Sequence, residues 1–495
     1  MKILLIQPPF YGFQNITSNR LYLGLAYLGA VLEKDGHDVL ILNGEFYFEK
    51  ISGQNEEITI NENEYQKNFT KDHFVYEKIL KDIIGFKPDV IAISFMTAGS
   101  TSAYYLAGHI RKILPEIPLI AGGIHPTLVP DEPLRNGFDY VIRSEGEVTI
   151  LELINHIREK TSDISKIQGI SYLKNGLTIN NENRPFIANL DDLPFPAFHL
   201  MKEYEKHVYA CKGIITSRGC PFECTYCASK LLWTRNVRFR SPENVVKEII
   251  YRHERYGINS FAFHDDTFTL RPKYVQEFCK RVLSLNFKIA WHCDTRGDTI
   301  DFSLLKLMRK AGCNHIYLGL ESGSPRIQKL IKKNIDTAKV KEAIKLARSA
   351  GIETTVYFMA GFPDETEEDL RLSIKAMKEL ASDYVIWSIL TPYPGTEVWK
   401  IAEDRGLISI ADCDWKNFFH HYNRGNLFKT IGEPIWNNLI NEIHWEEKII
   451  NNRLTWLKFK KKIKNKLYLI NLGLKNPSKI INFFLKKICP RKQPS

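Results

Sequence analysis

The sequence lacks the segments that mark membrane-spanning and secreted proteins. No stretch of about 18 consecutive apolar residues occurs in the 495-residue chain, so a membrane-spanning helix is not expected. The opening segment MKILLIQPPFYG lacks the apolar core and small-residue cleavage site of a signal peptide, and it predicts a buried strand instead. Nine cysteines are too few for a disulfide scaffold in a chain of this length. These absences predict a cytoplasmic protein, and the length predicts two or three domains.

Acidic residues are absent from the last part of the chain. From Arg453 to Ser495 there are 13 basic residues and no acidic one, so removing these charges from the total of +11 leaves residues 1–452 with a net charge of −2. A near-neutral body disfavours a nucleic-acid-binding core, and no nucleic acid partner is expected. In residues 453–488 Lys alternates with Leu, Trp, Phe and Ile at roughly helical spacing, which favours a basic amphipathic helix on an anionic membrane surface. A helix packed on the rest of the protein, with a solvated Lys face, is the alternative.

Nucleotide-binding signatures are also missing. Neither a Walker motif nor a GxGxxG fingerprint is present, so a nucleoside triphosphatase or a dehydrogenase has no support. Instead, continuous apolar strands alternate with amphipathic helix patterns over residues 1–160, which predicts an α/β domain with a doubly wound, Rossmann-like parallel sheet. The predicted strands are KILLIQ, HDVLILN, DVIAISF, PLIAGGIH and DYVIRSEGE. Residues 49–70 are polar and predict a surface insertion.

Three further parts follow this domain. Residues 161–205 predict a connector that contains a small hairpin, GISYLKNGLTINN, and a Pro-interrupted segment. Residues 206–405 resume the strand–helix alternation with six strands, fewer than the eight of a closed barrel, so a partial (β/α)6 barrel is predicted. Residues 406–495 predict a less regular, mostly helical C-terminal region that ends in the basic amphipathic tail.

Three cysteines are crowded into the segment SRGCPFECTYCASK, near the start of the predicted barrel. Cys220, Cys224 and Cys227 have the spacing C-x3-C-x2-C. Most 4Fe-4S clusters take four cysteines, and three would leave one iron open to a substrate or cofactor. The alternative is a zinc site with Cys211 as the fourth ligand, although structural zinc sites usually come as two short Cys/His pairs.

This segment resembles the signature of the radical S-adenosylmethionine (SAM) family, including Tyr226 before the last cysteine, and it follows the first strand of a partial barrel, where such barrels place their active sites. The resemblance covers about residues 210–405. It implies that the open iron chelates SAM and that one electron from the reduced cluster cleaves SAM to a 5′-deoxyadenosyl radical and methionine. It further implies an electron donor such as flavodoxin or ferredoxin.

Segments at the later strand ends resemble the SAM contacts of this family. FHDDTFT offers a carboxylate to the ammonium group of SAM, CDTRGD an arginine to its carboxylate, GLESGS acceptors to the ribose hydroxyls, and MAGFPDET a glycine beside the adenine. A helix cap or turn is the alternative for one of the two aspartates, and a structural ion pair for the arginine. The SAM-binding residues implied by the resemblance are Asp265, Asp266, Arg296, Glu321, Ser322 and Gly361.

The first domain resembles the cobalamin-binding domain that precedes many radical SAM barrels. The segments QPPF, LYLGLAYLGAVLEKDGH, ISFMT, GGIHPTLVPDE and RSEGE carry the resemblance. The loop after the first strand lacks the DxHxxG motif, whose His binds cobalt from below in some cobalamin proteins. A turn-capping role for the histidine of GGIHP, and a domain kept only for packing, are the alternatives. The cobalamin-binding residues predicted here are Thr97, Gly122, Gly123 and His125.

Together these resemblances imply a cobalamin-dependent radical SAM enzyme, most simply a methyltransferase acting on an unactivated carbon of a small hydrophobic molecule. The order of the parts resembles the branch that includes hopanoid methylases and the anaerobic magnesium-protoporphyrin ester cyclase, which suggests a lipid or tetrapyrrole substrate. A radical cyclase or C–C coupling enzyme is the first alternative. A non-catalytic iron–sulfur or cobalamin sensor is the second, but a sensor would not need the SAM-contact segments.

Overall fold

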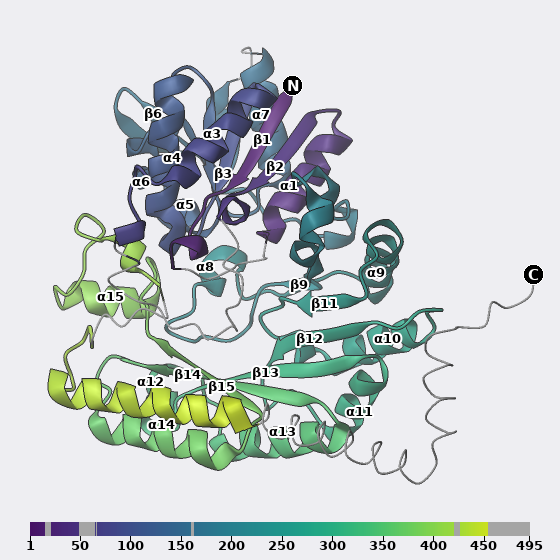
Figure 1. Cartoon of the computed structure of the whole chain (residues 1–495), viewed down its shortest axis with the longest axis vertical. Helices are drawn as coiled ribbons and strands as arrows, with labels where there is room; N and C mark the ends of the chain where they lie inside the picture. The colour runs from purple at the N-terminus through teal and green to yellow at the C-terminus, as the bar shows by residue number, and fades with distance from the viewer. Residues whose placement is uncertain (15–20, 49–64, 66, 160–162, 420–425, 454–495) are drawn as a thin grey trace, which may run out of the picture.

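The computed structural model describes residues 1–14, 21–48, 65, 67–159, 163–419 and 426–453. Figure 1 shows two α/β units, an N-terminal one above and a larger one below, with a C-terminal helix beside the lower sheet. The predicted fold class, a doubly wound sheet followed by a partial barrel, is confirmed. Within the described ranges no helix is both long and apolar enough to cross a membrane.

The N-terminal sheet has seven strands in the order β2-β1-β3-β4-β5-β6-β7. The first five are parallel, whereas β6 pairs antiparallel with β5, and β7 antiparallel with β6. The hairpin predicted in the connector thus exists and extends the sheet. The strands are β1 Lys2–Gln7, β2 Asp38–Asn43, β3 Val90–Ser94, β4 Leu119–Gly122, β5 Tyr140–Ile142, β6 Ile170–Lys174 and β7 Leu177–Asn180. The α-helices are α1 Leu23–Lys34, α3 Phe74–Phe86, α4 Ser100–Ile113, α5 Ile124–Leu128, α6 Asp131–Arg135 and α7 Glu147–Glu159.

Alternate side chains of each central strand enter different cores. Ile3 and Leu5 pack into a core that includes residues of α1 and α7 and continues into the barrel, whereas Leu4 and Ile6 pack into a core with residues of α3 and α4. Both faces of the sheet are covered, as the continuous apolar strands require. The order in which strands are added to the sheet reverses at β1, which has β2 on one side and β3 on the other, so the loops after β1 and β3 border the crevice where such sheets bind ligands.

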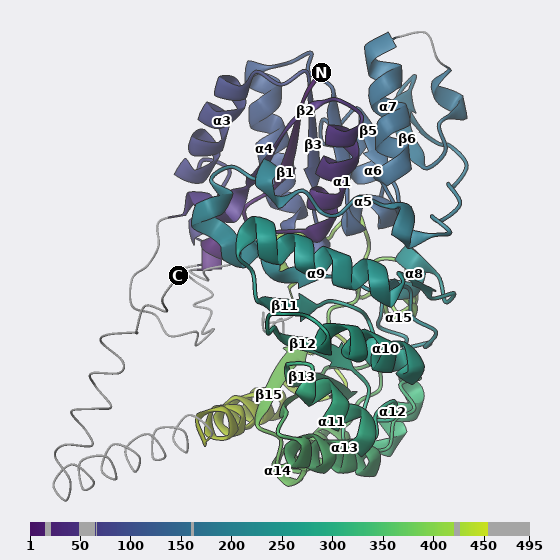
Figure 2. The same ribbon diagram turned by 90° about the vertical axis from the view of Figure 1, so that its right-hand side faces the viewer.

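The second unit is an open sheet of six parallel strands in the order β15-β14-β13-β12-β11-β8. Helices cover its outer side (Figure 2). Its strands are β8 Gly213–Ile214, β11 Ser260–Phe263, β12 Ala290–Thr295, β13 Cys313–Glu321, β14 Glu353–Ala360 and β15 Tyr384–Ile389, and a separate pair joins β9 Ser217–Arg218 to β10 Arg238–Phe239. The helices are α8 Ser229–Trp233, α9 Pro242–Tyr256, α10 Pro272–Leu283, α11 Phe302–Lys310, α12 Pro325–Leu330, α13 Thr337–Ala350, α14 Glu367–Leu380 and α15 Glu397–Asp404.

A further helix follows the barrel, in the region that the sequence predicted to be less regular. It occupies residues 433–453 and buries Trp436, Leu439 and Ile443. This C-terminal helix lies along the edge strand β15 (Figure 1), where Asn451 donates to and accepts from the backbone of Val385 at 3.0 and 2.9 Å. The helix therefore satisfies the backbone groups of Val385, which an edge strand would otherwise leave to solvent.

Candidate functional site

The cysteine loop runs from β9 to α8 at the carboxyl end of the first barrel strand. Gly219 precedes it with φ +112°, and a Cβ there would lie 2.9 Å from the carbonyl oxygen of Asn236, so only glycine fits. The Thr225 N–H donates to the carbonyl of Ile331 at 3.0 Å. The Thr225 carbonyl in turn accepts from the N–H of Val398 at 3.2 Å. The loop is thus fixed by the backbone of α12 and α15 on the opposite side of the barrel mouth.

The three thiols of this loop lie near one another. Cys224 is buried, and Cys220 and Cys227 are half-buried. The pKa of Cys227 is raised to about 11, mainly by burial and in smaller part by the neighbouring Asp266, Cys224 and Cys220. Among the described residues no three Cys, His, Asp or Glu side chains are arranged as a ready-made ion site. Thiolate ligands and one open side are the donor set that an iron–sulfur cluster takes, so the loop fits that group.

The zinc alternative loses its fourth ligand. Cys211 precedes β8 and is fully buried, and its carbonyl oxygen accepts from Nη1 of Arg252 at 3.0 Å. It therefore lies before the first barrel strand, whereas the cysteine loop follows that strand. The remaining described cysteines are buried or half-buried.

The two aspartates after β11 have different surroundings. Asp265 is 2% exposed and accepts from the hydroxyls of Thr216 and Ser217 at 2.7 and 2.6 Å, so its carboxylate holds the strand that leads into the cysteine loop. Asp266 accepts from the Ser229 hydroxyl at 2.5 Å, and its charge raises the pKa of Cys227. Of the two carboxylates, Asp266 is therefore the one beside the thiols.

Arg296 lies against the cysteine loop. Its guanidinium is 3.8 Å from the ring centre of Phe222, which stands between the first two cysteines. Nε and Nη2 donate to Asp298 at 3.0 and 2.8 Å, which is the structural ion pair foreseen as the alternative. Nη1 is buried and has no hydrogen-bond partner in the part of the chain that the structure describes. A buried donor without a partner fits the carboxylate of a bound ligand.

Glu321 ends β13 in a strained backbone conformation. Its φ is +70°, and the pairing of β13 with β14 shifts register between Gly319 and Glu321. The carboxylate pairs with Nζ of Lys333 at 3.0 Å, and Lys333 also reaches the Tyr226 hydroxyl at 3.5 Å. A Cβ on Gly319 would lie 2.6 Å from the Glu321 carboxylate and 2.7 Å from Nζ of Lys333. Sequence reasoning missed Lys333, which lies in a polar run, KKN, without any motif of its own.

Ser322 and Gly361, two further residues predicted to contact SAM, lie at the barrel mouth, but their hydrogen bonds are made to other groups of the protein. The Ser322 hydroxyl is fully buried, 3.0 Å from that of Ser373, and accepts from the N–H of Ser324. Gly361 has φ +92°, and its N–H donates to the buried carboxylate of Glu365 at 2.6 Å. Both residues therefore shape the loops after β13 and β14.

The predicted cobalamin residues gather at the carboxyl edge of β3 and β4. His125 is fully buried, its Nε2 lies 3.0 Å from Glu132, and its Nδ1 lies 3.4 Å from the Thr97 hydroxyl. A Cβ on Gly123 would lie 2.7 Å from the carbonyl oxygen of Phe95, directly after β3, whereas a Cβ on Gly122 would meet nothing within 4 Å. Gly122 thus leaves room for a large ligand, while both ring nitrogens of His125 are occupied within the protein.

The loop after β1 borders the same edge and depends on Glu45. This carboxylate is buried and accepts the backbone N–H groups of Phe10, Tyr11 and Gly12 at 2.8, 3.0 and 3.0 Å. Burial raises its pKa to about 7, although the three N–H groups act against this increase. Glu45 was not singled out in the sequence, because a carboxylate after a strand carries no pattern that distinguishes it from a surface residue.

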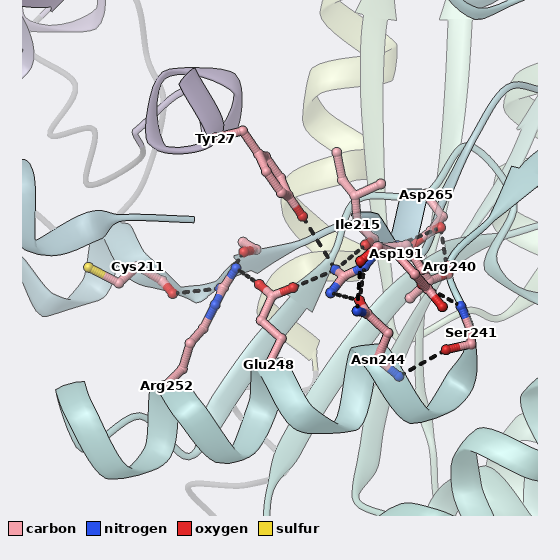
Figure 3. Close-up of polar contacts among 12 residues, drawn as sticks. Tyr27, Asp191, Cys211, Ile215, Arg240, Ser241, Asn244, Glu248, Arg252 and Asp265 are labelled. Carbon is pink, nitrogen blue, oxygen red and sulfur yellow. Dashed lines mark hydrogen bonds and ion pairs between the residues drawn. The ribbon is translucent and has the colours of Figure 1, made fainter. Parts of the chain in front are cut away.

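A buried ion-pair chain supports the strand that leads into the cysteine loop (Figure 3). Arg240 donates to the carbonyl of Ile215 at 3.0 Å and contacts the hydroxyl of Tyr27 in α1 at 3.3 Å. Glu248 of α9 pairs with Arg240 on one side and with Arg252 on the other. Because Tyr27 belongs to the N-terminal unit, this network joins that unit to the first strand of the barrel.

A doubly wound sheet above a partial barrel, with a three-thiol loop between them, defines a class of enzyme that combines two cofactor-binding modules. A family model described as B12 binding domain matches residues 18–154, and one described as Radical SAM superfamily matches residues 214–377. An uncharacterized methyltransferase of Pyrococcus horikoshii is 34% identical over 84% of this chain and 86% of its own. The chain therefore belongs to the cobalamin-binding radical SAM enzymes, and its cofactors are a 4Fe-4S cluster, SAM and cobalamin.

Two further similarities agree with this assignment. The anaerobic magnesium-protoporphyrin IX monomethyl ester cyclase of Synechocystis sp. is 28% identical over 84% of this chain and 80% of its own. A solved structure of the radical SAM methyltransferase TsrM from Kitasatospora setae, with cobalamin and a [4Fe-4S] cluster bound, superposes with a TM-score of 0.64 at 18% identity. It covers 83% of this chain and 79% of that chain, and it shows the fold alone.

Proposed function

We propose that the protein transfers a methyl group to an unactivated carbon of a small hydrophobic substrate. The observation that carries the proposal is the meeting of the cobalamin-binding sheet and the cysteine loop within one chain. The Pyrococcus relative, which spans most of both chains and is named a methyltransferase, supports it. Bound together, the cluster supplies an electron, SAM a radical that removes hydrogen, and cobalamin the methyl group.

The residues of the barrel mouth would hold these groups as follows. Cys220, Cys224 and Cys227 would ligate the cluster. The unpartnered Nη1 of Arg296 would bind the carboxylate of SAM, and Asp266 its ammonium group. At the rim of the barrel mouth, Glu321 would bond to the ribose of SAM and Gly361 would lie beside the adenine. Asp265 would support the cysteine loop, and Ser322 the loop after β13.

At the N-terminal edge, the open side of Gly122 would admit cobalamin. Gly123, Thr97 and His125 would support that edge from behind, because their contacts lie within the protein. No histidine occurs in residues 8–14 after β1, so bound cobalamin would lack an imidazole beneath cobalt from that loop. Electron paramagnetic resonance of the Co(II) form tests this: no axial nitrogen splitting is expected, and a splitting would show a nitrogen ligand on cobalt, from the protein or from the base of cobalamin itself.

Anaerobic assays test the methylation itself. Protein produced with cobalamin and reconstituted with iron and sulfide should hold about four irons, cleave SAM when reduced, and add one methyl group to the product. Changing Cys220, Cys224 or Cys227 to Ala should abolish iron binding and SAM cleavage, whereas Cys413→Ala, at a half-buried cysteine outside the loop, should retain both. Stoichiometric zinc without iron would contradict the cluster assignment. An absence of SAM cleavage would favour the alternative of a non-catalytic iron–sulfur or cobalamin sensor.

A radical cyclase or C–C coupling enzyme is the second candidate. The similarity to the magnesium-protoporphyrin ester cyclase favours it, since that relative also spans most of this chain. Comparing lipids and tetrapyrroles between a deletion strain and its parent would identify the substrate. A product that gains a ring or a C–C bond, but no methyl group from isotope-labelled SAM, would decide for this candidate.

We further propose that the protein associates with an anionic membrane surface and receives electrons from a flavodoxin or ferredoxin. Trp445 and Ile449 of the C-terminal helix are 65% and 48% exposed, and the helix leads into the basic tail. The structure of the tail beyond Arg453 lies outside the described residues. Deleting residues 453–495 should reduce binding to anionic vesicles and leave SAM cleavage largely intact, and full-length binding should weaken as salt is raised. Equal vesicle binding by both forms would contradict the role of the tail.

A further inference from the structure

A second buried ion-pair network lies directly before the cysteine loop. Arg218, in β9, is two residues from Cys220 and 7% exposed. Its Nη1 contacts Glu145 at 2.7 Å and its Nη2 contacts Glu147 at 2.5 Å. Glu145 lies in the loop after β5 and Glu147 is the first residue of α7, so both carboxylates come from the N-terminal unit. One side chain of the barrel is thus held by two carboxylates at the carboxyl edge of the cobalamin-binding sheet.

Arg238 makes this network resistant to rearrangement. It lies opposite Arg218 in the β9–β10 pair, and its Nη1 contacts Glu145 at 2.9 Å and the carbonyl of Ile187 at 2.6 Å. Glu145 also accepts the Ile187 N–H at 2.7 Å. Both oxygens of Glu145 are therefore occupied by groups from three segments of the chain. We call these four charged residues, Arg218, Arg238, Glu145 and Glu147, the Arg218 clamp.

The clamp leaves its arginine little freedom. The two carboxylates hold separate nitrogens of one planar guanidinium, which fixes its direction as well as its position. The guanidinium also lies 5.6 and 5.3 Å from the ring centres of Tyr27 and Trp233. The clamp contains two positive and two negative side chains, so its charge is balanced, and removing one partner leaves a buried charge uncompensated.

Movement of the clamp would pass directly to the cysteines. Only Gly219 separates Arg218 from Cys220, and Gly219 is packed against the backbone of Asn236 without room for a side chain. On the other side, Asp265 holds Thr216 and Ser217. The segment before the cysteine loop is therefore fixed by carboxylates of both units. The one residue between Arg218 and Cys220, Gly219, is itself tightly packed and cannot absorb a displacement.

We propose that Arg218 is a positioning residue that sets the cysteine loop at a defined distance and orientation from the carboxyl edge of the cobalamin-binding sheet. The inference rests on the proposed function, because it concerns two cofactors that must act on the same substrate carbon. Reactions of this kind are sensitive to misplacement of about 1 Å. Arg218 itself touches neither cofactor in this role, and acts through the loop that it holds.

Conservative variants test the proposal in the full-length protein loaded with both cofactors. Arg218→Lys keeps the charge but cannot hold two carboxylates with a planar fork. We expect iron content and the SAM-induced spectral change to remain, while the spin–spin interaction between Co(II) cobalamin and the reduced cluster changes. We also expect the ratio of 5′-deoxyadenosine to methylated product to rise about tenfold, since SAM cleavage continues while transfer to the substrate becomes inefficient.

The controls separate positioning from folding. Arg281→Lys alters a solvent-exposed ion pair with Glu277 within α10, away from the cysteine loop, and should leave all these readouts at the wild-type level. The double variant Arg218→Met with Glu147→Gln removes one charge of each sign, so it should recover thermal stability relative to Arg218→Met alone without recovering the wild-type spin–spin interaction. Recovery of both in the double variant would show a merely structural role and overturn the proposal.

Hydrogen exchange supplies a readout that needs no cofactor. In Arg218→Lys, the backbone amides of residues 143–147 and 217–219 should exchange faster together, and in Arg281→Lys they should not. Unchanged exchange, or an unchanged spin–spin interaction in a folded Arg218→Lys protein, would overturn the inference. A wild-type protein that binds both cofactors but methylates nothing would contradict the proposed function alone, since the spin–spin and exchange results would still stand.

Discussion

Glu45 shows how one side chain can make the N-terminal unit sensitive to pH. Burial raises its pKa from an ordinary 4.5 to about 7. A carboxyl group whose pKa is higher in the folded state stabilises that state at low pH, and this contribution is lost as pH rises through the folded-state pKa. We therefore expect Glu45 to lower the free energy of unfolding between about pH 4.5 and about pH 7, by up to about 3 kcal/mol.

Glu45→Gln tests this expectation, because the amide keeps an acceptor for the N–H groups of the β1 loop and does not titrate. The difference in unfolding free energy between wild type and variant, measured by urea denaturation across this range, should shift in favour of the variant as pH rises. The exposed carboxylate Glu116 provides the control for a Glu→Gln change. A difference that stays constant with pH would contradict the raised pKa.

Gly319 is a second residue with a specific expected effect. A methyl group there would lie 2.6 and 2.7 Å from the two charged groups of the Glu321–Lys333 pair, so the pair must shift. We expect Gly319→Ala to weaken SAM binding about tenfold, a cost of about 1.4 kcal/mol, while iron content stays unchanged. Equilibrium titration with SAM measures the effect, and Gly108→Ala, where a methyl group meets nothing within 4 Å, is the control. An unchanged SAM affinity would argue against a role of this pair in SAM binding.

For single residues, the sequence predicted the position in the fold better than it predicted the hydrogen-bond partners. Asp265, Ser322 and Gly361 all follow barrel strands as expected, since strand ends can be located from hydrophobic patterns. Their bonds could not be predicted, because whether a carboxylate or hydroxyl faces ligand or protein depends on neighbours distant in sequence. Asp265, for example, is bound by residues 48 and 49 positions away. Lys333 was missed for the same reason.

Among the helices and strands, the C-terminal helix allows a direct mutational test of its contact with the edge strand β15. Asn451 exchanges two hydrogen bonds with Val385 of the edge strand β15, and Glu447 accepts the Trp387 N–H at 3.3 Å. We expect Asn451→Ala to lower the free energy of unfolding by about 1–3 kcal/mol, because it leaves backbone groups of Val385 without their partner. Asn452→Ala, at the exposed neighbouring position, should have little effect. Equal effects of the two variants in thermal or urea unfolding would contradict the proposed edge contact.

The strands and helices were largely predictable, because periodicity depends on local sequence. Helix α9 begins after a Ser241 cap, whose hydroxyl accepts from the Asn244 N–H at 3.1 Å, and ends at Gly257 with φ +67°, two residue types that commonly bound a helix. Which strands pair with one another was harder to predict from the sequence. The hairpin β6–β7 was predicted, but not its pairing with β5, because a hairpin carries its own register but no signal for its neighbour. The polar insertion predicted at 49–70 lies mostly outside the described residues.

At the scale of the whole molecule, Trp415 connects the two units. It is 3% exposed, its Nε1 donates to Glu132 of the N-terminal unit at 2.6 Å, and its ring lies 5.9 Å from that of Trp399 in α15. We expect Trp415→Ala to cost about 3–5 kcal/mol of stability, since it leaves a cavity and an acceptor without its donor. Trp415→Phe should cost less because it keeps most of the packing.

Calorimetry can tell this interface effect from general destabilisation. If Trp415 joins the units, Trp415→Ala should separate one unfolding transition into two, as the units lose their common interface. The exposed Trp445 is the matched control, and Trp445→Ala should unfold as the wild type does. A single transition lowered in temperature for Trp415→Ala would show that the units remain joined without it.

An incomplete barrel has two free edges that a closed barrel lacks, and each is a place where a second molecule could add a strand. At β15 the amide of Asn451 occupies the backbone of Val385. At the opposite edge, the guanidinium of Arg252 occupies the carbonyls of Cys211 and Gly213 beside β8, at 3.0 and 2.5 Å. At each edge, side-chain groups thus form hydrogen bonds with backbone groups that a neighbouring strand would otherwise bond. The sheet can therefore stay open while these backbone groups are not available to pair with the edge of another sheet.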